Sequence, residues 1–166
     1  MELATLENEA SRMKDGELVL IMRYTGAHPS ALLDPRYKFE EYHEGGTTFI
    51  RWLRPKKTGR EAYTIIPKAK RIANINVNVV IKELQSRKRR CSRQYLYELC
   101  RRVGEAAGIP GVSPMTLRHT LAVDLLSRGM DSDVVRQTLN VSHKTLRTYA
   151  KFTTRTKANA FEAVGW

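Results

Sequence analysis

Arg118, His119 and Tyr149 are the residues of this sequence whose types and spacing best suit chemistry on a phosphate group. An arginine guanidinium is a rigid fork of donors that fits phosphate oxygens. A tyrosine hydroxyl can act as a nucleophile, and a histidine beside the arginine can contact phosphate or assist proton movement. These three residues therefore predict a site that handles a phosphate group.

The segment 113–152 has to position these side chains. Ser113 is a favourable N-cap and Pro114 a favourable first helical residue, and Gly129 ends the helix that they begin. The apolar residues of this helix recur at helical spacing and form one buried stripe: Leu117, Leu121, Ala122, Leu125 and Leu126. The arginine and the histidine lie off that stripe. Asp131 starts a second helix, and a third short helix carries the tyrosine.

A small β region precedes this segment. Residues 3–25 predict a helix in two pieces, with Asp15 as the cap of the second piece. Gly45-Gly46 then supplies a hairpin turn, and 55–59 supplies another. The expected strands are 37–42, 47–53 and 61–66. The pattern predicts a small three-stranded antiparallel sheet within a mainly helical α+β domain.

Helices connect the sheet to the central segment. A helix is expected from Ala69 to Leu84, and another after Ser92, which can cap it. Between them lies the basic run 86–93, which fits a solvated linker or, in a protein that binds DNA, a set of phosphate contacts. The tail 153–166 is expected to form a last short helix.

The charge of the chain indicates a polyanionic partner. The sequence holds 29 Lys and Arg against 17 Asp and Glu, a net charge of +12 in 166 residues. Nucleic acid is the first candidate for such a partner, and a well-solvated basic surface is the alternative. This length suits one domain with a substantial core.

Cysteine usage and hydropathy indicate the compartment. Cys91 and Cys100 are too few for a disulfide framework, and their spacing fits no zinc motif. We expect reduced thiols in a cytoplasmic protein. No apolar run approaches the roughly 18 residues that a membrane span needs, and the first residues do not resemble a signal peptide. No membrane association is expected.

The order of these motifs resembles the catalytic domain of the tyrosine recombinase (phage integrase) family. That family has a helix ending in Thr-Gly-x-Arg-x-Ser-Glu, a lysine in a hairpin turn, His-x-Leu-Arg-His-Thr, Leu-Gly-His and then a helical tyrosine. The corresponding segments here are 25–31, 54–59, 115–120, 139–141 and the helix of Tyr149. Leu-Arg-His-Thr with a tyrosine about 30 residues later, behind a small sheet with a turn lysine, is the most specific part of the match.

The resemblance implies a fold and an activity. It implies that residues 1–166 form a single catalytic domain of the tyrosine recombinase type, and that the separate N-terminal core-binding domain of relatives is absent. It implies site-specific breaking and rejoining of double-stranded DNA through a 3′-phosphotyrosyl intermediate, without metal or cofactor. Relatives act as four protomers on two DNA sites, so a homotetramer on DNA is expected, in integration, excision or a related process of a mobile element.

The resemblance also assigns roles to residues. Tyr149 is the expected nucleophile, Arg118 a clamp on the phosphate, and Lys57 the general acid, with Lys56 as the alternative. His119 is expected to orient or contact the phosphate rather than transfer a proton. Each also has a plainer interpretation: a surface arginine, a polar turn residue or a half-buried helix tyrosine.

Three positions depart from the family pattern. His28 stands where the family has its first arginine, Met115 where it has a histidine, and Val141 where it has a histidine or tryptophan. His143, two residues further on, is a candidate to occupy the vacated space. Since losing one preorganised donor costs about 10²- to 10³-fold in rate in other enzymes, we expect reduced or absent catalysis. If protonated His28 replaces the arginine, cleavage should fall between pH 6 and 8.

A second interpretation makes the protein a DNA binder without catalysis. Residues 131–150 also read as a helix-turn-helix, in which the first helix packs through Val134, Val135 and Leu139 and Ser142 caps a recognition helix. Its exposed residues would then face a groove: His143, Lys144, Arg147 and Lys151. A recombinase fold that has lost catalysis is a related alternative.

Overall fold

The structure, a computed structural model, describes residues 2–54, 62–139 and 141–150. Its elements are α1 (Glu2–Arg12), α2 (Gly16–Thr25), α3 (Pro29–Leu33), β1 (Lys38–Glu44), β2 (Thr47–Arg54), β3 (Ala62–Pro67), the 3₁₀ helix η1 (Lys70–Ile72), α4 (Val77–Gln85), α5 (Arg93–Ala106), α6 (Pro114–Ser127), α7 (Ser132–Leu139) and α8 (His143–Ala150). The mainly helical α+β fold predicted from the sequence is confirmed. The expected tail helix at 153–166 lies outside the described residues.

The three strands form one antiparallel sheet in the order β1-β2-β3, as expected. Gly45 and Gly46 both have positive φ, 57° and 79°, which a two-residue hairpin turn of type I′ requires. The register pairs Trp52 with Phe39 on β1 and with Thr64 on β3. The central strand therefore carries a tryptophan between two paired neighbours, and this side chain is fully buried.

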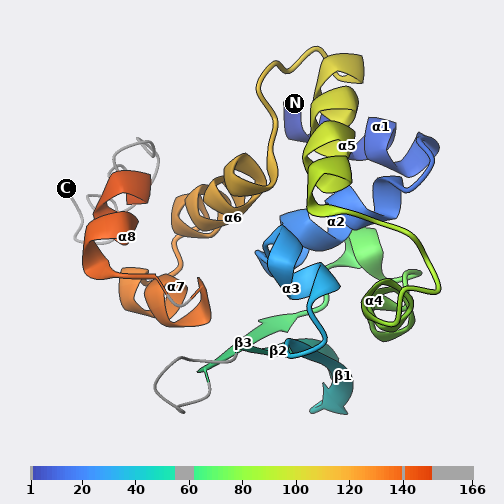
Figure 1. The fold of residues 1–166 in the computed structure, drawn as a ribbon. Helices are drawn as coiled ribbons and strands as arrows, with labels where there is room; N and C mark the ends of the chain where they lie inside the picture. Colours follow the sequence, from blue (N-terminus) through green and yellow to red (C-terminus); the bar gives the residue numbers. More distant parts are fainter. Residues whose placement is uncertain (1, 55–61, 140, 151–166) are drawn as a thin grey trace.

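Helix α2 lies at the centre of the molecule (Figure 1). Leu18, Ile21 and Met22 are completely buried in it. It packs against α1, α5 and α6. Figure 1 shows α6, α7 and α8 to one side of α2, α5 above it, and α3 and the sheet below it. Helix α7 packs against β3 and α6, and α8 packs against α6 and α7, so both C-terminal helices are held in place by α6.

Short-range signals predicted several helix starts correctly. Ser113 and Thr116 form a reciprocal capping box at α6, and the Ser92 hydroxyl accepts the backbone N–H of Tyr95 at the start of α5. On α6, Leu117 is buried as expected. These caps fix where the helices that carry the candidate site begin.

Two expectations about helix boundaries are wrong. Asp15 does not cap α2 with its side chain; it has φ 64°, and its carboxylate accepts hydrogen bonds from Arg89 and Tyr95 instead. The helix expected from Ala69 is divided into η1 and α4, because the Asn76 side chain accepts the N–H of Val79 and starts a new helix there.

A buried ionic network joins α1, α2 and α6. Arg23 is 2% exposed, and its Nη2 lies 3.2 Å from Asp124 Oδ2 and its Nε 3.9 Å from Glu7 Oε1. The Tyr24 hydroxyl donates to Glu7. Burial, together with this hydrogen bond, raises the pKa of Tyr24 to about 12. The network fixes α6 against the two N-terminal helices.

Both cysteines are free thiols. Cys100 is fully buried and Cys91 half-buried. Burial raises the pKa of Cys100 to about 12 and that of Cys91 to about 11, because the thiolate loses its hydration. Neither cysteine has the character of a reactive thiol. No helix in the described part of the chain is long and apolar enough to cross a membrane.

Candidate active site

Arg118 joins three helices at the candidate site. It lies in the second turn of α6 and is half-buried. Its Nη1 donates to the carbonyl of Gly26 at 2.7 Å, and its Nη2 donates to the carbonyl of Leu139. Gly26 ends α2 and Leu139 ends α7. Because helix C-termini carry partial negative charge, a cation is favourable there. The guanidinium thereby fixes both helix ends relative to α6.

Gly26 is required for this arrangement. Its φ is +69°, a conformation that L side chains rarely adopt. A Cβ at this position would lie 3.0 Å from Leu139 Cδ2 and 3.3 Å from Leu121 Cδ2. The absent side chain lets the end of α2 approach α6 and α7 closely, which brings the Gly26 carbonyl within reach of Arg118.

His28 lies two residues beyond Gly26 and caps α3. Its Nδ1 accepts the backbone N–H of Ala31 at 3.3 Å. The ring is edge-on to Tyr37, with centroids 5.3 Å apart, and to Trp52, at 6.1 Å. Nδ1 can accept a hydrogen bond only when it carries no proton, so the cap corresponds to the neutral imidazole with its proton on Nε2.

Trp52 packs against the same segment, from Thr25 to His28. Its ring stacks on Phe39 with centroids 5.6 Å apart. Its indole N–H donates to the Thr25 carbonyl at 3.3 Å. The tryptophan therefore contacts both the end of α2 and the ring of His28.

His119 and His143 occupy different environments. His119, next to Arg118 on α6, is half-buried, and this burial lowers its pKa from the ordinary value of 6.5 because the charged form loses hydration. His143 is exposed at the first residue of α8. The Ser142 hydroxyl accepts the N–H of Thr145 and begins that helix, as expected.

Helix α8 contains Tyr149 in its last turn. This helix packs against α6, and its Leu146 is buried. The tyrosine side chain lies outside the described residues, as do Lys57 and its alternative Lys56. The structure thus brings the helix of the expected nucleophile onto the helix of Arg118.

Two of the three substituted family positions, Met115 and Val141, offer no donors at this site. Met115 is 65% exposed near the start of α6, and Val141 is half-buried against the core. One part of the helix-turn-helix expectation is wrong: Val134 is 47% exposed, whereas Val135 and Leu139 are fully buried as expected. His143, Lys144 and Arg147 are exposed on α8, as that expectation requires.

The sequence indicated Arg118 and His28 as candidate site residues, but it did not indicate the groups that contact them. The acceptors of Arg118 are backbone carbonyls, which no residue type reveals. The sequence indicated Trp52 only as one residue of an expected strand. Among the described residues, no three or more His, Cys, Asp or Glu side chains are grouped so that they could hold a metal ion.

The fold is that of a tyrosine recombinase catalytic domain. The chain belongs to the phage integrase family, whose model matches residues 3–158. It is 25% identical over 162 residues to tyrosine recombinase XerA from Pyrococcus furiosus, covering 92% of this chain and 54% of that protein.

Two solved recombinases share the fold. One is the XerH site-specific recombinase bound to palindromic difH substrate in a post-cleavage complex, with TM-score 0.71, 20% identity and coverage of 98% of this chain and 50% of that one. The other is the XerA recombinase, with TM-score 0.69, 19% identity and coverage of 98% and 60%. The chain thus spans about half the length of the relatives it matches.

The state of the two histidines leads to a prediction about pH. Protonating His28 at Nδ1 would break the cap of α3, and burial lowers the pKa of His119, which favours its neutral form. We therefore expect no fall in DNA cleavage between pH 6 and 8 that depends on His28, in contrast to what the sequence alone suggested. The measurement is the rate of adduct formation across this range. A fall that disappears in His28→Ala would instead show that a protonated His28 contacts phosphate.

Proposed function

We propose that this protein is a site-specific DNA recombinase or integrase that cleaves and rejoins double-stranded DNA with Tyr149. The observation that carries the proposal is the placement of Arg118. On α6 it holds the ends of α2 and α7 together, beside the helix that contains Tyr149. Membership of the phage integrase family and the XerA relative support the same activity.

The reaction needs a nucleophile, charge stabilisation and a proton donor. In the proposed step the Tyr149 oxygen attacks phosphorus, gives up its proton to a base or to water, and forms a 3′-phosphotyrosyl bond. The bond from phosphorus to the 5′ oxygen breaks, and Lys57 protonates that oxygen. Attack by a 5′-hydroxyl reverses the step and releases the tyrosine. No net bond energy is lost, so rejoining needs no cofactor.

Arg118 would stabilise the negative charge that develops on the phosphate oxygens. Its two hydrogen bonds to carbonyls fix the orientation of the guanidinium before DNA arrives. His119, on the next residue of α6, would contact phosphate as a neutral donor. His28 and His143 would contribute donors at positions where the family pattern is altered. Such preorganisation lowers the cost of reorganising dipoles during the reaction.

The remaining parts of the proposal concern the whole protein. We propose that residues 1–166 act as one catalytic unit, that the partner is double-stranded DNA, and that copies of the chain assemble on it, up to a tetramer, in the cytoplasm. The net charge of +12 supports the DNA partner. No metal or other cofactor enters this mechanism.

A second candidate function is DNA binding without cleavage. The observation that favours it is that Met115 and Val141, at two family positions for phosphate donors, have side chains that cannot donate a hydrogen bond. The exposed basic face of α8 would serve such a binder. Both functions predict salt-sensitive DNA binding, so only a covalent adduct separates them.

Covalent trapping tests the proposal. The protein is incubated with supercoiled plasmid and with nicked duplexes from its genomic neighbourhood, and denaturing gels are examined for a protein–DNA adduct. We expect an adduct with the wild type, none with Tyr149→Phe, and an unchanged adduct with the matched control Tyr97→Phe, whose tyrosine is exposed on α5. DNA binding without any adduct would favour the non-catalytic function.

A further inference from the structure

The loop between α4 and α5, residues 86–92, carries a concentration of positive charge. Arg87, Lys88 and Arg90 are exposed on it. None of the three forms a salt bridge with a described residue, in contrast to many other arginines of the chain. Exposed cations without acidic partners remain available for an anionic ligand.

The loop is held at its middle by Arg89. This arginine turns toward the body of the protein, where its Nη2 contacts the carboxylates of Asp15 and Glu17. The Tyr95 hydroxyl also donates to Asp15. That hydrogen bond is the main cause that lowers the pKa of Asp15, with Arg89 adding to it. The carboxylate therefore stays ionised, and it anchors the loop to the start of α2.

The loop is held at its N-terminal end by Gln85. Its Nε2 lies 3.3 Å from the carbonyl of Ala31, 3.1 Å from that of Asp34 and 2.8 Å from that of Tyr37. These contacts join the end of α4 to α3 and the turn after it. Because the loop is fixed at its start and at its middle, the charged side chains are presented from a defined backbone, and less conformational entropy is lost on binding.

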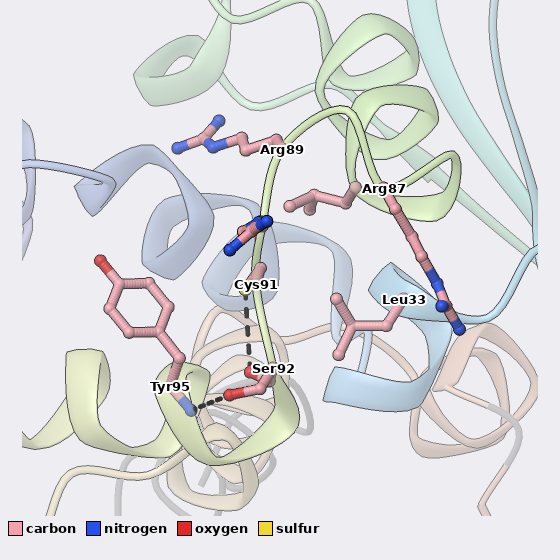
Figure 2. A pocket seen from close by; sticks show the side chains of 8 residues that line it. Leu33, Arg87, Arg89, Cys91, Ser92 and Tyr95 are labelled. Atoms are coloured by element: carbon pink, nitrogen blue, oxygen red, sulfur yellow. Dashed lines mark hydrogen bonds between the residues drawn. The ribbon is translucent and has the colours of Figure 1, made fainter.

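A pocket of about 800 Å³ lies beneath the loop (Figure 2). Arg87 and Arg90 line it together with Leu33, Leu84 and Tyr95, and none of its lining residues is acidic. In Figure 2 Arg87 runs alongside Leu33, whereas Arg89 points away toward the N-terminal helices. A positively charged, open pocket without carboxylates suits phosphate oxygens.

The pocket lies close to the candidate active site through α3. His28 caps the first turn of α3, and Leu33, the last residue of this helix, lines the pocket. At 1.5 Å per residue, these two positions are about 7.5 Å apart along the helix. The pocket and the His28 end of α3 are therefore separated by little more than the length of this short helix.

We propose that the loop 86–92 is a second phosphate-binding site, which binds the DNA backbone beside the candidate active site through Arg87 and Arg90. This inference rests on the proposed function, because it takes DNA as the partner. Contacts to the backbone position DNA without reading its sequence, so the loop contributes to affinity and orientation and not to the choice of site.

The test compares two variants that lose the same charge. Arg87→Gln/Arg90→Gln removes two cations from this loop, and Lys70→Gln/Arg128→Gln removes two exposed cations from the lining of a different pocket, beside β3 and α6. Binding of a 30-base-pair duplex of arbitrary sequence is measured by fluorescence anisotropy over a range of salt concentrations. Thermal melting checks that both variants are folded.

We expect the loop variant to lose about one to two orders of magnitude in affinity near 0.1 M salt. The slope of log affinity against log salt should fall by about 2, one for each lost phosphate contact. The control should change neither. Equal affinity and slope for loop variant and wild type would overturn this inference and leave the proposed function intact. A wild type that binds no duplex would overturn both.

Discussion

Replacing Arg118 by alanine is expected to reduce adduct formation by at least about 10²- to 10³-fold, the usual cost of one preorganised donor at a developing negative charge. The same change should lower the free energy of unfolding. The carbonyls of Gly26 and Leu139 are buried and would each lose a donor, at about 1–3 kcal/mol for an unsatisfied buried group. Single-turnover cleavage and urea unfolding measure the two effects separately.

A second variant at position 118 separates the effect of the positive charge from that of the guanidinium geometry. Arg118→Lys keeps the charge, but a single ammonium lacks the planar fork that reaches both carbonyls, so we expect most of the activity to be lost as well. Arg128→Ala is the matched control on the same helix. Its side chain is 76% exposed in a surface pair with Asp124, and such pairs contribute little. Cleavage by Arg118→Ala within tenfold of wild type would contradict the assigned role.

Replacing Trp52 by alanine is expected to cost about 3–5 kcal/mol, the usual range for a large buried aromatic residue. That is a large share of the roughly 5–15 kcal/mol that stabilises a domain. The change removes the stacking on Phe39 and the hydrogen bond to the Thr25 carbonyl, and it leaves a cavity under His28. Urea unfolding followed by circular dichroism measures the loss without depending on tryptophan fluorescence.

Trp52→Phe tests the hydrogen bond within that effect. It keeps an aromatic ring against Phe39 but leaves the buried Thr25 carbonyl without its donor, so about 1–3 kcal/mol should be lost. Tyr63→Ala on β3 is the control, because this ring is 46% exposed and lies at the surface in a cation–π contact with Arg51. It should cost no more than about 1 kcal/mol. A Trp52→Ala protein as stable as this control would contradict the role given to the tryptophan.

Local signals allowed much of the fold to be predicted. The Gly45-Gly46 turn fixed the hairpin, and Ser92 and Ser113 marked two helix starts, because each acts through neighbours in the sequence. The expectation that the Asp15 side chain caps α2 was wrong for the opposite reason. As a local signal it suits a cap, yet Tyr95 and Arg89, about 75–80 residues away, compete for the carboxylate and hold the residue in a left-handed conformation.

Motif order indicated Arg118, His28 and the helix of Tyr149 as the candidate site, and their roles stay predictions. In the structure Arg118 donates to the carbonyl of Gly26, two residues before His28. What holds Arg118 could not be predicted, because its partners are main-chain carbonyls at helix ends. The cap made by His28 was also missed, although histidine before proline at a helix start is a place where a side chain can accept a backbone N–H. That cap changed the expected pH dependence.

Identifying the residue attached to DNA tests the central claim most directly. The trapped adduct would be digested with nuclease and protease, and the peptide that carries a residual nucleotide would be sequenced by mass spectrometry. We predict a 3′-phosphate joined to Tyr149, in the peptide that follows Arg147. A nucleotide on any other residue, or an adduct that persists unchanged in Tyr149→Phe, would contradict the assignment of α8 as the helix that carries the nucleophile.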